Sequence, residues 1–149
     1  GSPYAMSFGN LLSGTVVDGP QKIWFDLDTN ADYGARIYVS SNTAGLTSQS
    51  ASNTITSATA NLSAVAEGFG AQSASATQTS GGPLTATSPY DGTANNVGII
   101  NTTLRQFYSS PGPVSSARSS LLLKAKAGVQ TPSADDYQSI LTAIAAASF

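Results

Sequence analysis

Two segments near the start of the chain alternate between apolar and polar residues with a period of two. Within residues 22–29, the apolar members of the alternation are Ile23, Phe25 and Leu27. Residues 35–41 repeat the pattern with Ala35, Ile37 and Val39. A period of two is typical of a β-strand with one buried face, so both segments are predicted to be strands.

The residues between these two segments predict a tight reversal of the chain. Asn30, Asp32 and Gly34 are common turn residues, because Asn and Asp hydrogen-bond their own backbone and glycine tolerates a positive φ. The two strands are therefore expected to pair as a hairpin. In such a hairpin Trp24 and Tyr38 lie on adjacent strands, on the face opposite the apolar one.

The polar surface of this chain consists mainly of hydroxyl groups instead of charges. Only 9% of the 149 residues are charged, whereas Ser and Thr number 23 and 16. Hydroxylated and β-branched residues suit strands and turns better than helices. The predicted fold is all-β, a single antiparallel β-sandwich of Ig-like or jelly-roll-like type over residues 7–149. Residues 1–6 are interpreted as a cloning scar and are left out of the fold prediction.

The composition also excludes several function classes. The chain has no Cys and no His, which removes thiolate chemistry, the Ser-His-Asp triad and the usual zinc ligands. A net charge of −2 argues against nucleic-acid binding, and no apolar run approaches the ~18 residues of a transmembrane segment. Glu67 is the only glutamate, and the adjacent Asp135 and Asp136 would point to opposite faces of a strand. We therefore expect a protein that is not an enzyme.

Residues 42–96 are dominated by small and polar residues, and two interpretations stay open for them. The first is a low-complexity linker, and the second is a series of short strands with ordered loops. Recurrent apolar residues favour the second interpretation: Leu46, Ile55, Leu62, Val65 and Phe69. This prediction includes a short helix within residues 58–68.

For the C-terminal residues, the local spacing predicts a helix and the resemblance predicts a strand. Ser133 is a suitable N-cap, and the spacing of Tyr137, Ile140, Leu141 and Ile144 is helical. As a whole, however, residues 131–149 resemble the closing strand of bacterial surface β-sandwiches, which often combine proline and small residues with a Tyr-x-x-x-Leu-Thr-x-x-Ala pattern. Because tertiary context overrides helix propensity, a strand is predicted.

Shorter segments extend this resemblance along the chain: residues 7–14, 27–35, 45–48 and 67–71. The chain is similar in style to spore-coat-U-like fimbrial proteins, WxL-type wall-surface domains and uncharacterised exported proteins of candidate-phylum bacteria. The resemblance implies an all-β sandwich, export to the cell surface or the extracellular space, and a role there without catalytic residues.

Four oxygen-bearing side chains alternate along one short stretch: Asp26, Asp28, Asn30 and Asp32. Calcium binds about six to eight oxygens, so one hypothesis is a calcium site. The EF-hand pattern is not met, because Ala31 and Ile37 stand where it requires glycine and glutamate. The alternative is a polar strand face that leads into a turn. No other cofactor is expected.

Aromatic side chains provide candidate contacts for sugar rings: Trp24, Tyr33, Tyr38, Tyr90 and Tyr108. Rings with a polar group are favoured at interfaces, but the same residues suit a core that a second sheet covers. Both interpretations remain open at this level.

These patterns predict a non-enzymatic structural or adhesive domain on a bacterial surface. Its expected partners are other surface-protein subunits or host and environmental glycans. One alternative is a pilin-like subunit that lacks its N-terminal helix or strand and accepts a strand from a neighbour. A second alternative is a carbohydrate-binding module with a calcium site.

Overall fold

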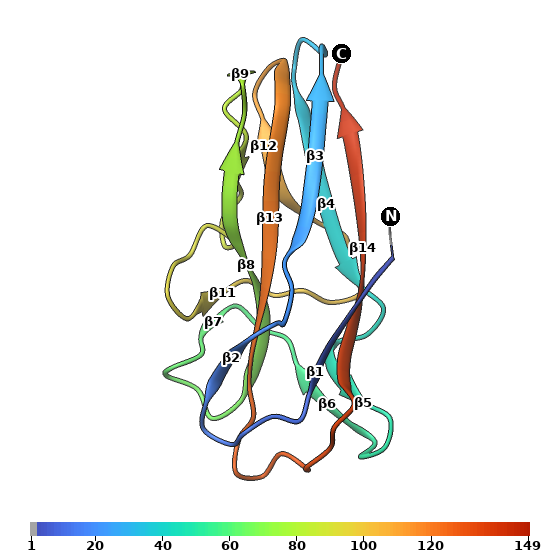
Figure 1. Cartoon of the computed structure of the whole chain (residues 1–149), viewed down its shortest axis with the longest axis vertical. Helices are drawn as coiled ribbons and strands as arrows, with labels where there is room; N and C mark the ends of the chain where they lie inside the picture. The colour runs from blue at the N-terminus through green and yellow to red at the C-terminus, as the bar shows by residue number, and fades with distance from the viewer. Residues whose placement is uncertain (1–2) are drawn as a thin grey trace.

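Every regular element among the described residues of this protein is a β-strand. The computed structural model describes residues 3–149 and contains no helix within them. The strands form two main antiparallel sheets that pack against each other (Figure 1). Apolar side chains from both sheets belong to one buried cluster, so the predicted all-β sandwich is confirmed.

The larger sheet has the strand order β10-β12-β4-β14-β5-β6, and β1 also pairs with β14. Its strands are β1 (Tyr4–Gly9), β4 (Ala35–Ser41), β5 (Gly45–Ser48), β6 (Asn53–Thr56), β10 (Thr85–Ala86), β12 (Arg105–Ser110) and β14 (Tyr137–Ala147). β14 therefore has β4 and β5 on one side and β1 on the other.

The smaller sheet is organised around one long central strand. Its strands are β2 (Val16–Asp18), β3 (Ile23–Thr29), β8 (Gly68–Thr77), β9 (Ser80–Gly81) and β13 (Val114–Lys126). β13 pairs with β2 and β3 along one edge and with β8 and β9 along the other (Figure 1). A separate two-stranded sheet joins β7 (Ala60–Asn61) to β11 (Asn96–Val97).

Residues 22–41 contain both predicted strands, β3 and β4, but the predicted hairpin is wrong. β3 pairs with β13 in the smaller sheet, whereas β4 pairs with β12 and β14 in the larger one. Residues 30–34 therefore cross from one sheet to the other. Phe25 and Ile37 both belong to the core, each from a different layer of the sandwich. A period of two shows which face of a strand is buried but not which strand lies next to it.

Gly34 allows this crossing. Its φ is +74°, and a Cβ atom at this position would overlap the carbonyl oxygen of Ser110. The Gly34 N–H donates a hydrogen bond to the Ala31 carbonyl at 3.0 Å, and its carbonyl accepts one from the Ser148 N–H at 2.9 Å. The chain thus enters β4 through a position where no side chain fits.

The short helix predicted within residues 58–68 is absent, and this stretch consists of β7, turns and bends, and the first residue of β8. The Asn61 side chain accepts a hydrogen bond from the Ser63 N–H at 3.0 Å, which offers the backbone an alternative to a helix. The fully buried Leu62 donates its N–H to the Asn95 carbonyl at 2.8 Å. The rest of residues 42–96 forms the predicted short strands and ordered loops.

Residues 137–147 form β14, as predicted from the resemblance and against the local helical pattern. Hydrogen-bonding neighbours on both sides decide this outcome, because β4 and β1 both pair with this segment. β1 also includes Tyr4 and Ala5 and the buried Met6, which lie within the stretch left out of the fold prediction.

Candidate functional site

The aromatic residues proposed as sugar contacts do not form one surface. Trp24 lies on the outer face of β3 and Tyr38 on the outer face of β4. Because these strands belong to different sheets, the two rings lie on opposite faces of the sandwich, and the predicted aromatic pair is wrong. Tyr33 is exposed in the loop that crosses between the sheets.

Two of the aromatic candidates are core residues and are not available to a ligand. Tyr90 is 1% exposed, stacks on Phe107 with ring centroids 4.5 Å apart, and donates a hydrogen bond to the Ile99 carbonyl at 2.5 Å. Burial raises the pKa of the Tyr90 phenol. Tyr108 is fully buried and donates its hydroxyl to the Ser120 carbonyl at 2.6 Å. Of the two interpretations left open for these rings, Tyr90 and Tyr108 therefore follow the core one.

The Trp24 ring is in contact with a side chain of its own sheet. The guanidinium of Arg118 lies 4.6 Å from the centre of the indole ring, within the range of a cation–π contact. Arg118 also pairs with Asp26 at 2.8 Å. On this outer face of the smaller sheet, Arg118 thus contacts both the Trp24 ring and the Asp26 carboxylate.

The predicted calcium ligands are not brought together. Asp26 is paired with Arg118, and Asp28 accepts a hydrogen bond from the Ser116 N–H at 2.5 Å. Asn30 and Asp32 are exposed in the following loop. Within residues 3–149, no three acidic side chains lie close enough to hold a metal ion. The calcium hypothesis gains no support from the arrangement of these side chains.

The carboxylate of Asp136 accepts hydrogen bonds that hold two segments of the fold together. Its carboxylate accepts hydrogen bonds from the Ser48 hydroxyl at 2.5 Å, from the Ser50 hydroxyl at 2.8 Å and from the Ser50 N–H at 2.9 Å. These donors stabilise the ionised form, which lowers the pKa of Asp136 to about 2. The interaction ties the loop between β5 and β6 to the start of β14.

We expect the Asp136→Asn variant to unfold at a lower temperature than the parent chain at neutral pH. Because the pKa of Asp136 is lowered to about 2 in the folded state, its contribution is present above its ordinary value near 3.8 and is lost as the pH falls toward 2. Thermal unfolding measured between about pH 5 and pH 2 should thus be less pH-dependent in the variant. Asp135→Asn, with the same change of charge at an exposed neighbour, is the control.

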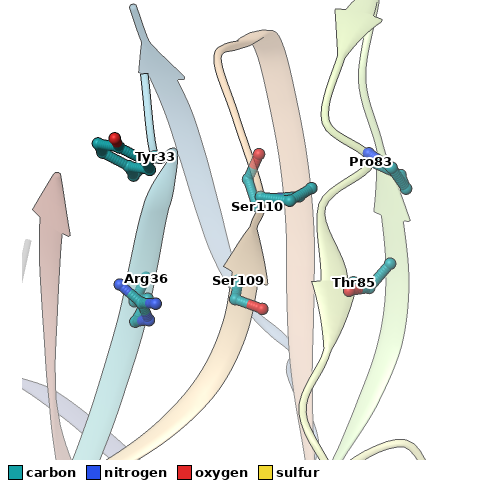
Figure 2. A pocket seen from close by; sticks show the side chains of 7 residues that line it. Tyr33, Arg36, Pro83, Thr85, Ser109 and Ser110 are labelled. Carbon is teal, nitrogen blue, oxygen red and sulfur yellow. The ribbon is translucent and has the colours of Figure 1, made fainter. Parts of the chain in front are cut away.

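A shallow groove lies across three strands of the larger sheet, near the end where the chain crosses between sheets. Figure 2 shows Arg36 on β4, Ser109 on β12 and Thr85 on β10, with Tyr33 at one end of the groove. The groove has a volume of about 460 Å³, and Pro83, Ser110 and Pro111 complete its lining.

Sequence reasoning found only Tyr33 among the groove residues. Arg36 was visible in the sequence as a polar member of the alternating segment, but its neighbours come from strands about fifty and seventy residues further along the chain. The exposed Arg36 guanidinium donates a hydrogen bond to the Ser148 hydroxyl at 3.1 Å. The groove thus combines an aromatic ring, a cation and several hydroxyls.

Comparisons of the chain with protein-family models, with curated proteins and with solved structures found no match. Residues 3–149 include no helix that could span a membrane. The proposals that follow rest on the geometry and chemistry described above.

Proposed function

We propose that this chain is a non-enzymatic structural or adhesive domain displayed on the surface of a bacterium. Its partners are other surface-protein subunits or glycans of a host or of the environment. The resemblance of residues 131–149 to closing strands of surface β-sandwiches supports this proposal. The main support, however, is the way in which the fold is held together.

Hydroxyl groups make many of the polar links between segments distant in sequence. The buried Ser41 and Ser139 hydroxyls lie 2.9 Å apart and link β4 to β14. The Ser57 hydroxyl donates to the Phe69 carbonyl at 2.8 Å and accepts from the Ile100 N–H at 2.9 Å. These links are uncharged, so salt does not screen them.

Ion pairs, by contrast, are few. The described residues contain two, Arg118–Asp26 at 2.8 Å and Lys124–Asp18 at 2.9 Å. Between about 0.01 M and 1 M salt the Debye length falls from about 30 Å to about 3 Å, which weakens exposed charge pairs. A fold held by hydroxyl links suits a protein that meets the variable salt concentration outside a cell.

Antibody labelling of cells that produce the protein tests this proposal. An antibody raised against the folded chain is applied to intact cells and to permeabilised cells. Equal labelling of both samples, removed from the intact cells by added protease, is the expected result. Labelling that appears only after permeabilisation would overturn the proposal.

A second candidate function, glycan binding, is favoured by the groove in Figure 2. The Tyr33 ring is 68% exposed at one end, and Arg36 and Thr85 provide hydrogen-bond donors beside it. An exposed ring with nearby donors is the chemistry that binds a sugar, the ring through its face and the donors through sugar hydroxyls or a carboxylate.

We expect Tyr33→Ala and Arg36→Ala each to weaken binding of any glycan that the chain retains on a glycan array by about tenfold or more. Tyr38→Ala removes a ring from β4, the strand that carries Arg36, but outside the groove, and it should leave binding unchanged. If no glycan is retained, or if Tyr33→Ala binds as the parent chain does, the groove is not a glycan site.

A further inference from the structure

Three polar side chains of the groove in Figure 2 lie in one row across the larger sheet. Arg36 on β4 is directly opposite Ser109 on β12, and Ser109 is directly opposite Thr85 on β10. Opposite residues of antiparallel strands point to the same face, and the buried neighbours of Arg36, Ala35 and Ile37, show that this is the outer face. Because adjacent strands lie about 4.8 Å apart, the row is about 10 Å long, enough to contact more than one sugar unit.

The two hydroxyls of this row do not hold the fold together. Elsewhere in the same sheet, the hydroxyls of the directly opposed Thr47 and Thr54 bond to each other at 3.1 Å. Ser109 and Thr85 are opposed in the same way, but within residues 3–149 neither hydroxyl has a hydrogen-bond partner. Both hydroxyls are therefore available to a ligand.

The charge of Arg36 has no counter-ion in the part of the chain that the structure describes. Both ion pairs there use other cations, Arg118 and Lys124. The side-chain hydrogen bond of Arg36 goes to an uncharged acceptor, the Ser148 hydroxyl, at 3.1 Å. A guanidinium has five N–H donors, so this bond leaves others for a ligand. Asp32, the acid nearest to Arg36 in the sequence, does not line the groove, and neither does any other described acidic residue.

We propose that the ligand of this groove is an acidic sugar, a hexuronic acid or sialic acid unit, whose carboxylate pairs with Arg36. The inference rests on the glycan binding proposed above and names the class of glycan. A planar guanidinium matches a carboxylate through two parallel hydrogen bonds, and such charge-assisted bonds are roughly twice as strong as neutral ones.

The rest of the groove favours a sugar over a simple anion. The hydroxyls of Ser109 and Thr85 bond to hydroxyls of the sugar, for which a small carboxylate has no equivalent. The Tyr33 ring, 68% exposed at one end of the groove, contacts a face of the sugar ring.

Matched pairs of glycans on an array test the inference. Trigalacturonic acid and sialyllactose are each presented beside their own methyl ester, which keeps the sugar rings and removes the negative charge. We expect the parent chain to bind the acid of at least one pair about tenfold or more tightly than the ester. The pair that shows this difference identifies the acidic sugar as a hexuronic acid or a sialic acid.

Three variants locate the contact. Arg36→Gln keeps hydrogen-bond donors without a charge, and it should bind acid and ester with equal affinity. Arg36→Lys keeps the charge without the planar pair of donors, and it should retain only part of the difference. Lys22→Gln removes the same charge from an exposed residue outside the groove, and it should bind as the parent chain does. Circular dichroism verifies that each variant is folded.

Equal binding of acid and ester by the parent chain would overturn this inference and leave glycan binding in place. A preference for the acid that persists in Arg36→Gln would overturn it as well. Retention of no glycan, neither acid nor ester, would instead show that the groove is not a glycan site, and the inference would fall together with that function.

Discussion

Replacing Gly34 with alanine is expected to lower the free energy of unfolding strongly. The φ of Gly34 is +74°, a region that costs an L-residue about 1 kcal/mol or more. The added methyl group would also overlap the carbonyl oxygen of Ser110, a backbone atom of β12 that cannot move without breaking its pairing with Ala35. Together these effects should cost roughly 3 kcal/mol or more, a large part of the ~5–15 kcal/mol that stabilises a typical domain.

Two other glycines separate the backbone effect from the steric effect. Gly14 has a φ of +78°, and no atom lies within 4 Å of the position that a Cβ would take there, so Gly14→Ala should cost only about 1 kcal/mol. Gly112 lies beside Gly34, has no positive φ, and its nearest neighbour to a Cβ would be the Asp32 carbonyl at 3.8 Å. Gly112→Ala should be close to neutral.

Urea unfolding of the three variants, followed by far-ultraviolet circular dichroism, measures these costs. The expected order of the free energy of unfolding is Gly112→Ala, Gly14→Ala and then Gly34→Ala, from most to least stable. A Gly34→Ala variant as stable as Gly14→Ala would contradict the role of the close approach to Ser110.

The sequence predicted the strands of residues 22–41 but not their neighbours, and the reason is physical. Alternation depends only on which side of a strand faces the core, and Phe25 and Ile37 are buried whether their strands pair or face each other. The choice between a hairpin and a crossing depends on the space around Gly34, and that space is set by Ser110, a residue far along the chain. No local pattern contains this information.

The residues of the groove could not all be predicted from the sequence, for the same reason. Tyr33 was identified from its residue type, but Arg36 and Thr85 meet only because β4, β12 and β10 are neighbours. Residues 137–147 form β14 because β1 and β4 pair with them. Those residues even favour a helix locally, and only the strands on either side decide the outcome.

Replacing Tyr108 with phenylalanine is the second change with a large expected effect. Tyr108 lies on β12 of the larger sheet, and its hydroxyl crosses the interior to donate to the Ser120 carbonyl of β13 at 2.6 Å. The Ser75 carbonyl of β8 lies 3.1 Å from the same hydroxyl. The register of β8 and β13 shifts at this point, between Ser120 and Leu121, so the phenol occupies an irregularity in the smaller sheet.

Tyr108→Phe keeps the ring and its edge contact with Phe25, whose centroid lies 6.4 Å away, but leaves buried carbonyl groups without this donor. An unsatisfied buried polar group costs about 1–3 kcal/mol, and we expect a loss of that size in urea unfolding. Tyr38→Phe removes a hydroxyl from the outer face of the neighbouring strand β4 and should change stability by less than about 0.5 kcal/mol. Equal effects of the two substitutions would contradict the bridging role.

The pH dependence gives a second, independent measure of the same phenol. Burial raises the pKa of Tyr108 to about 12, against an ordinary value of 10.0. Between these values the unfolded chain loses this proton while the folded chain retains it, so the contribution of Tyr108 to stability is complete below pH 10 and is lost as the pH rises toward 12. Unfolding measured across this range should show a decline in the parent chain that is smaller in Tyr108→Phe. A parent chain and a Tyr108→Phe variant with identical alkaline slopes would place the Tyr108 hydroxyl in contact with water.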